Sequence, residues 1–194
     1  FLATANCIVY AGATPDFVDI DPITYTIDPN LVEEKVKFYQ SKGKKVKAII
    51  GVDYAGLPCD WKALREIADK YDLQLVNDNC HALGASYFNN KQYAVKHADL
   101  TIQSYHPVKH LTTGEGGAIT TVNKELYEKL LILRTHGITK SPEILSENHG
   151  SWYYEMHELG YNYRMTDIQA ALGVQQLKKN DEWVKRRREL VQQY

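Results

Sequence analysis

The stretch from Lys47 to Asn77 determines the fold class, and its sequence is KAIIGVDYAGLPCDWKALREIADKYDLQLVN. It begins with an apolar run of strand length over 47–52 and ends with another over 73–77. Between these runs Asp60 is a suitable helix N-cap, and apolar residues then recur on one helical face, at Leu64, Ile67, Ala68 and Tyr71. Strand, helix and strand in this order are typical of a βαβ unit, so the sequence predicts an α/β domain with a mainly parallel sheet.

The same alternation continues on both sides of this unit. Further strands are predicted over residues 16–20, 100–103 and 118–122. Further helices are predicted from Asp28-Pro29 to about Gln40, from the cap Asn123 through Leu133 to a stop at Gly137, from the capping box Thr166-Asp167-Ile168-Gln169 onward, and over 181–194. Residues 138–160 have no clear periodicity, and so long a loop in a compact domain is usually functional or mobile.

Composition narrows the classes of partner. The 194 residues include 23 basic and 24 acidic side chains, with a formal net charge of −1, so no charge excess attracts nucleic acid or an anionic membrane. No apolar stretch reaches the roughly 20 residues that a membrane span needs. The chain has three cysteines, a small and odd number that does not indicate a disulfide framework. We therefore expect a cytoplasmic protein with small-molecule or protein partners.

One loop contains the residues that point to chemistry. Residues 104–117 connect two predicted strands and have the sequence SYHPVKHLTTGEGG. Ligands of open α/β sheets bind beyond the carboxyl ends of the strands, where Ser104 and the earlier Asp78 lie. The Lys109 amine can form a Schiff base, the Asp78 carboxylate can face a pyridine nitrogen, and the Ser104 hydroxyl can reach a phosphate. This set predicts a site for pyridoxal 5'-phosphate, with His81 bordering the ring.

Each of these residues also has an ordinary structural explanation. Asp78 and Ser104 are common turn residues, and His81 can be a partly buried histidine with its hydrogen bonds satisfied. Cys59, Cys80 and His81 suggest zinc, but the sequence has no C-x-x-C pair or closely spaced second ligand pair. No metal site is predicted.

Four segments, in this order along the chain, resemble the DegT/DnrJ/EryC1/StrS family of sugar aminotransferases. They are NDNCHALGA at 77–85, SYHPVK at 104–109, GEGG at 114–117 and GYNYRM at 160–165. Residues 13–21, ATPDFVDID, resemble a further segment of the family. Within the family, the stretch 104–117 most resembles the pseudaminic acid branch. The family often has Glu-Asp where this chain has Asn77-Asp78.

The resemblance implies a fold type I large domain, a three-layer α/β/α sandwich with a mostly parallel sheet, in a homodimer that uses pyridoxal phosphate. Carried over by motif, Lys109 is the catalytic lysine that holds the cofactor covalently. Asp78 is the partner of the pyridine nitrogen, Ser104 is a phosphate ligand, and His81 lies beside the ring. Asn162 matches an asparagine that reaches the phosphate in the neighbouring subunit.

The resemblance also implies an activity. The expected reaction transfers an amino group from L-glutamate to C4 of a UDP-linked 4-keto-6-deoxy sugar. A keto sugar linked to dTDP or GDP is an alternative substrate, and a non-catalytic binding protein that keeps the fold and cofactor is another alternative.

The family resemblance further implies a division of the chain. Residues 1–180 match the central part of the cofactor-binding large domain, without its N-terminal part. Residues 181–194 form a helix that leads toward a small C-terminal domain, most of which is absent. The chain starts without Met and ends within a charged helical pattern, so we expect a longer polypeptide.

Overall fold

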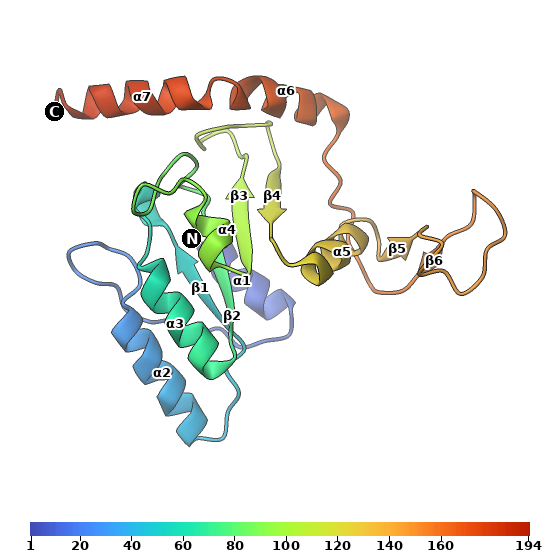
Figure 1. Cartoon of the computed structure of the whole chain (residues 1–194), viewed down its shortest axis with the longest axis horizontal. Helices are drawn as coiled ribbons and strands as arrows, with labels where there is room; N and C mark the ends of the chain where they lie inside the picture. Colours follow the sequence, from blue (N-terminus) through green and yellow to red (C-terminus); the bar gives the residue numbers. More distant parts are fainter.

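A four-stranded sheet organises the computed structural model, which describes residues 1–194 (Figure 1). Its strands are β1 (Ala48–Val52), β2 (Gln74–Asp78), β3 (Leu100–Ser104) and β4 (Gly117–Thr120). The order in the sheet is β1-β2-β3-β4. The first three strands are parallel, and β4 pairs antiparallel to β3. The predicted α/β class with a mostly parallel sheet is confirmed.

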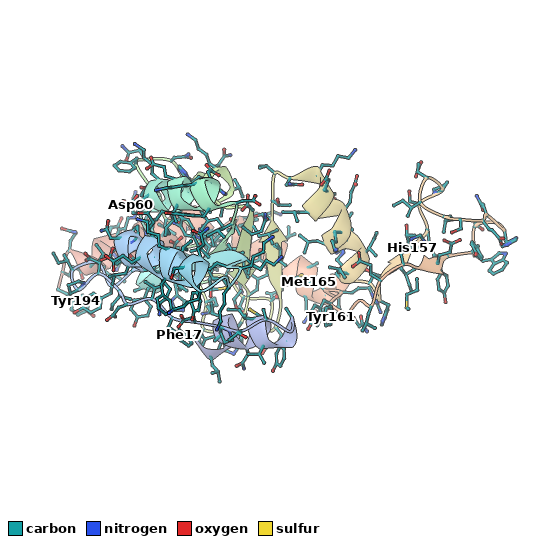
Figure 2. The ribbon with its side chains drawn as sticks, turned by 90° about the horizontal axis from the view of Figure 1, so that it is seen from below. Phe17, Asp60, His157, Tyr161, Met165 and Tyr194 are labelled. Carbon is teal, nitrogen blue, oxygen red and sulfur yellow. The ribbon has the colours of Figure 1, made fainter.

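Helices cover both faces of this sheet. The helices α2 (Pro29–Ser41), α3 (Trp61–Tyr71) and α4 (Tyr93–His97) lie on one face, and α1 (Leu2–Tyr10) lies on the other (Figure 2). Asp28 and Asp60 cap α2 and α3 as predicted, because their carboxylates accept hydrogen bonds from backbone N–H groups of the first turn. The main apolar core lies between the sheet and α2, α3 and α4, and includes Val32, Val36, Ile49, Trp61, Leu64, Leu75 and Tyr93.

The second half of the chain continues from β4 into α5 (Lys124–Leu133), capped by Asn123 as predicted. The capping box at Thr166 and Gln169 is also present and begins α6 (Asp167–Leu177). α7 (Asn180–Val191) follows, close to the predicted 181–194. The helices α6 and α7 run across the end of the sheet where β3 ends (Figure 1). None of the helices combines the length and apolar character that crossing a membrane requires.

The predicted strand over 16–20 is wrong. This segment forms only an isolated bridge between Ile20 and Ile27. The backbone N–H groups of Phe17 and Ile20 donate to the carboxylates of the residues just before them, Asp16 and Asp19. Such local side-chain acceptors compete with strand pairing for the backbone donors, and an alternating pattern alone does not supply a partner strand.

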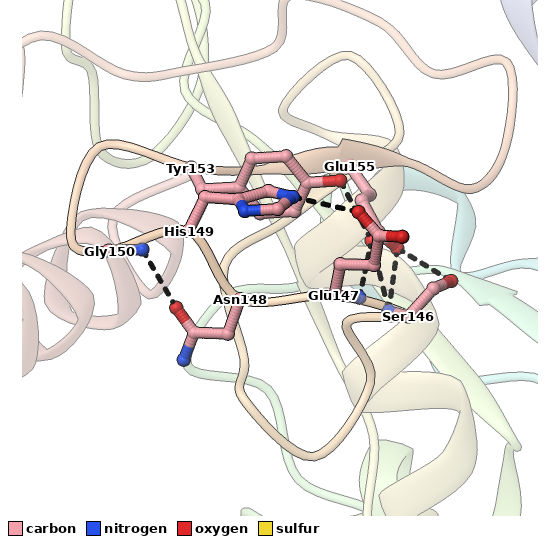
Figure 3. A network of polar contacts seen from close by, with 7 residues as sticks. All are labelled: Ser146, Glu147, Asn148, His149, Gly150, Tyr153 and Glu155. Atoms are coloured by element: carbon pink, nitrogen blue, oxygen red, sulfur yellow. Dashed lines mark hydrogen bonds and ion pairs between the residues drawn. The ribbon is translucent and has the colours of Figure 1, made fainter.

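Residues 138–160, which we call the arm, form a hairpin that projects from the rest of the chain (Figure 1). Two short strands, β5 (Ile138–Thr139) and β6 (Glu155–Met156), pair antiparallel. The Glu155 carboxylate accepts from the backbone N–H of Ser146 at 3.0 Å and from that of Glu147 at 3.2 Å (Figure 3). These bonds from Ser146, then the contact with His157, lower the pKa of Glu155 to about 2. The arm therefore has a defined anchor despite its lack of sequence periodicity.

The Glu155 contacts predict acid sensitivity of the arm. Because the pKa of Glu155 is lowered from 4.5 to about 2 in the folded chain, its stabilising contribution is complete above pH 4.5 and is lost as the pH falls toward 2. We expect Glu155→Gln to accelerate amide hydrogen exchange at Ser146 and Glu147 several-fold at neutral pH. Glu147→Gln is the control, because the Glu147 carboxylate pairs with His149 instead. Equal exchange in wild type and Glu155→Gln would contradict this account.

Candidate cofactor-binding site

The carboxyl ends of β2 and β3 place two of the predicted residues at one edge of the sheet. Asp78 is the last residue of β2 and Ser104 the last of β3. The two strands are parallel, with Asp78 in register with Ile102, so both side chains lie where ligands of α/β sheets bind. Lys109 lies in the connection from β3 to β4, which leaves the sheet at this edge. Asp78, Ser104 and Lys109 are each half-buried.

The Asp78 carboxylate links two parts of the fold. It accepts a hydrogen bond from the Thr4 hydroxyl of α1 at 2.8 Å and one from the backbone N–H of Cys80 at 3.2 Å. The second contact is the turn role that an aspartate after a strand often has. A carboxylate has about four acceptor sites, so Asp78 retains capacity for a further donor such as a protonated ring nitrogen.

The charges of Asp78 and Lys109 act on the same neighbours. Burial lowers the pKa of His81, the positive charge of Lys109 lowers it further, and the negative charge of Asp78 opposes both. Burial raises the pKa of the Cys80 thiol to about 12, with a further contribution from Asp78 and an opposing one from Lys109. The fold therefore brings the predicted carboxylate, amine and imidazole to one place. His81 also lies 6.2 Å from Tyr54, measured between ring centroids.

The loop that carries Lys109 is held by α6. The backbone N–H of Thr112 donates to Gln176 Oε1 at 2.9 Å, and Gln169 Nε2 donates to the carbonyl of Glu115 at 3.0 Å. Gly116 has a φ of +151°, and a Cβ there would lie 2.5 Å from the Thr113 hydroxyl oxygen. A glycine is needed at this position because a side chain would clash within the loop.

Ser104 and Asn162 occupy different environments. The Ser104 hydroxyl oxygen accepts from the backbone N–H of His106 at 3.4 Å, which leaves its own hydrogen free to donate. Asn162 is exposed and forms an isolated bridge with Thr135, next to α5. It has no hydrogen bond to Asp78, Ser104 or Lys109 within this chain. The structure thus brings four of the five predicted residues to the strand ends and leaves Asn162 apart.

The sequence analysis missed a buried polar cluster directly behind Asp78. Its centre is Asp53, which follows β1 and is 0% exposed. Its carboxylate accepts five hydrogen bonds, from Cys59 N, Trp61 Nε1, Asn77 Nδ2, Asn79 Nδ2 and Tyr93 OH. The available signal was an acidic residue at the end of an apolar strand, together with the polar run Asn77-Asp78-Asn79 at the end of the next one.

The donor and acceptor set fits pyridoxal phosphate. A carboxylate, an amine and a hydroxyl with a free hydrogen lie at one sheet edge, and each suits a different part of that cofactor. The imidazole of His81 lies beside the first two.

Residues 1–194 match the DegT/DnrJ/EryC1/StrS aminotransferase family, and the chain belongs to this family. It is 41% identical over 195 residues to a UDP-4-amino-4,6-dideoxy-N-acetyl-beta-L-altrosamine transaminase from Campylobacter jejuni. It is 34% identical over 194 residues to GDP-perosamine synthase from Escherichia coli O157:H7. Both alignments cover 100% of this chain and 48% of the relative, so the chain spans about half the length of these curated relatives.

Solved structures give the same relationship. Helicobacter pylori PseC, an aminotransferase involved in the biosynthesis of pseudoaminic acid, is 35% identical with a TM-score of 0.80. That match covers 93% of this chain and 44% of PseC. Spr1654 from Streptococcus pneumoniae, in its PMP-form, is 33% identical with a TM-score of 0.84, over 99% of this chain and 51% of Spr1654. The fold type I architecture expected from the resemblance is confirmed.

The environment of Cys80 predicts its reactivity. Because the thiolate is the nucleophile and the pKa of Cys80 is raised to about 12, we expect iodoacetamide near neutral pH to alkylate Cys80 at least about tenfold more slowly than the exposed Cys7. Asp78→Asn removes a negative charge that helps to raise this pKa, so it should increase the alkylation rate of Cys80 several-fold. Peptide mass mapping over time measures both rates. An alkylation rate of Cys80 that is unchanged by Asp78→Asn would contradict the contribution of Asp78 to the raised pKa of Cys80.

Proposed function

We propose that the protein containing this chain is a pyridoxal phosphate-dependent aminotransferase acting on a nucleotide-linked keto sugar. One observation carries the proposal: Asp78 and Ser104 end the adjacent parallel strands β2 and β3, and Lys109 lies in the β3–β4 connection that leaves the sheet at the same end. The bound cofactor supplies an electron sink for the carbon that loses a proton. Membership of an aminotransferase family supports this reading of the site.

Within the proposed site, each residue has a distinct task. With pyridoxal phosphate bound, Asp78 would face the ring nitrogen and would favour its protonated form through its negative charge. Ser104 would donate its free hydroxyl hydrogen to the phosphate, and His81 would border the ring. Lys109 would hold the cofactor covalently in the absence of the amino donor.

Lys109 then moves a proton. With the cofactor bound, the neutral amine of Lys109 would accept the proton from the substrate carbon at Nζ and would deliver it to the cofactor carbon that carried the aldehyde, which is general base and general acid catalysis by one group. The half-buried position of Lys109 limits the water that would otherwise exchange this proton. The loop contacts with α6 restrict where the amine can reach.

The proposed amino donor is L-glutamate, and the proposed acceptor is C4 of a UDP-linked 4-keto-6-deoxy sugar. The similarity to the Campylobacter jejuni transaminase supports this acceptor. The similarity to GDP-perosamine synthase supports a GDP-linked sugar as the second candidate. Initial rates with UDP-, GDP- and dTDP-linked 4-keto sugars separate these candidates.

We further propose that residues 1–180 belong to the cofactor-binding large domain and that 181–194 lead toward a second, smaller domain. The relatives are about twice as long as this chain, and this length accommodates a second domain.

Substitution of Lys109 tests the activity. We expect Lys109→Ala to lower the rate at which L-glutamate converts the bound cofactor by about 10²–10⁴-fold, the usual contribution of a general acid–base group. Stopped-flow absorbance in a single turnover measures this rate. Borohydride reduction of the wild type should fix a phosphopyridoxyl group on Lys109, as peptide mass mapping would show.

Lys124→Ala, at an exposed position of α5, is the matched control and should keep the wild-type rate. Cofactor binding by the wild type without any response to L-glutamate would favour the non-catalytic binding protein instead.

We also propose that the protein is a homodimer in which Asn162 reaches the cofactor phosphate of the partner subunit. Asn162 lies outside the site of its own chain, and the exposed rings of its two neighbours in sequence, Tyr161 and Tyr163, stack with their centroids 4.8 Å apart. Other large apolar side chains are exposed in the arm and in α6, at Trp152, Tyr154, Met156, Leu159, Ile168 and Leu177. Large exposed apolar side chains gathered in one region are typical of an interface. Figure 2 shows this part of the chain, labelled at His157 and Tyr161, extending beyond the sheet.

Complementation between variants tests this arrangement. Asn162→Ala and Lys109→Ala homodimers should each have low activity at limiting cofactor. In the purified mixed dimer, one of the two sites has both groups intact, so about half of the wild-type activity should return. No recovery in a mixed dimer of wild-type sedimentation would show that Asn162 does not act across the interface.

A further inference from the structure

We infer that Asp53 is a positioning residue that holds the backbone on both sides of Asp78 and thereby sets where the Asp78 carboxylate lies. The inference rests on the proposed role of Asp78 toward the cofactor. The Asp53 side chain lies on the opposite, core-facing side of the strand ends, and none of the hydrogen bonds of this side chain goes to a proposed cofactor-binding residue.

Both oxygens of the Asp53 carboxylate accept hydrogen bonds, so the side chain has a fixed position. Its Oδ2 accepts from Tyr93 OH at 2.6 Å, from Asn79 Nδ2 at 2.7 Å and from Asn77 Nδ2 at 3.2 Å. Its Oδ1 accepts from Trp61 Nε1 and from the backbone N–H of Cys59, both at 2.9 Å. A carboxylate only accepts hydrogen bonds, and all five contacts come from donors.

These hydrogen bonds hold the residues on both sides of Asp78 in place. Asn77 precedes Asp78 and is 0% exposed, and Asn79 follows it and is 3% exposed. The backbone N–H of Asp53 also donates to the carbonyl of Asp78 at 3.1 Å. One residue at the end of β1 therefore contacts three consecutive residues at the end of β2.

The same cluster extends to β3, which carries Ser104. The backbone N–H of Asn79 donates to the carbonyl of Ile102 at 2.9 Å, and Gln103 Nε2 donates to Asn79 Oδ1. The turn after β2 is thus fixed from both neighbouring strands. Successive side chains point to opposite faces of a strand, so this arrangement directs Asp78 toward α1, where Thr4 donates to it.

The substitution Asp53→Asn isolates this effect because it keeps the size of the side chain. An asparagine replaces one acceptor oxygen with an NH2 group, which would face donors on one side of the cluster. Either the pair Cys59 and Trp61 or the group Asn77, Asn79 and Tyr93 loses its acceptor. The strand end around Asp78 should then loosen, although no residue that contacts cofactor has changed.

The experiment uses the complete protein and two measurements. The first is amide hydrogen exchange of the peptide spanning 74–83 in the cofactor-free protein, and the second is the Kd for pyridoxal phosphate by absorbance titration. We expect Asp53→Asn to accelerate exchange in this peptide and to raise the Kd about tenfold, as loss of a supporting contact around a ligand typically does. The control is Val36→Ala, a core truncation in α2 at a buried residue that does not belong to the cluster.

The outcomes separate positioning from general destabilisation. A raised Kd and faster exchange in Asp53→Asn, with neither in Val36→Ala, support the inference. A Kd within twofold of wild type in Asp53→Asn, or an equal rise in both variants, overturns it. If Asp53→Asn does not fold, Asn79→Ala removes one donor and leaves Asp53 its other four, and the same criteria apply.

Failure of the proposed function gives a different result. In that case the wild type itself does not bind pyridoxal phosphate. Unchanged exchange of the 74–83 peptide in Asp53→Asn would then still overturn the structural part of the inference, and faster exchange would support it.

Discussion

The buried hydrogen bonds of Asp53 are the constraint on which the geometry of the strand ends depends. A carboxylate inside a protein is stable only when donors replace the water it loses, and here the donors come from α3, α4 and the end of β2. Removal of the acceptor would leave several buried donors unsatisfied, at a cost of about 1–3 kcal/mol for each. The cluster therefore admits one arrangement of the strand ends and resists others.

Side chains alternate between the two faces of β2, so the core-packing residues and the Asp78 carboxylate lie on opposite faces of the sheet. Leu75 and Asn77 face the core beneath α3, and Asp78 points toward α1. The backbone can thus be held rigidly from the core side while the Asp78 carboxylate, the proposed partner of the cofactor ring, stays accessible on the other. A site built on regular strands in this way is positioned more accurately than one built on loops alone.

The Lys109 loop and the arm depend on the second half of the chain. α6 holds the loop at Thr112 and Glu115 through Gln176 and Gln169, so the loop that carries Lys109 depends on residues that follow it far along the sequence. The arm, by contrast, is anchored within itself by Glu155. Its exposed apolar side chains are unusual for a surface that faces only water, which agrees with the proposed role of this region at a subunit interface.

Local signals in the sequence were sufficient for much of the fold. The βαβ unit, the caps at Asp60 and Asn123 and the capping box at Thr166 were predicted correctly, because propensity and capping depend on residues within a few positions of one another. The structure also brings together the carboxylate, amine and imidazole that the family motifs single out, and their roles toward the cofactor stay predictions. The predicted strand over 16–20 was wrong, since pairing requires a partner strand that the segment itself does not encode.

The sequence by itself thus determined the α/β class, the helix starts and the chemical types available at the strand ends. Only the tertiary structure decided that Asp53 binds both neighbours of Asp78, that α6 holds the loop of Lys109, and that Asn162 lies apart. The physical reason is the range of the interactions. Hydrogen bonds between residues distant in sequence form only when the whole chain has packed, and no local pattern specifies which donor meets which acceptor.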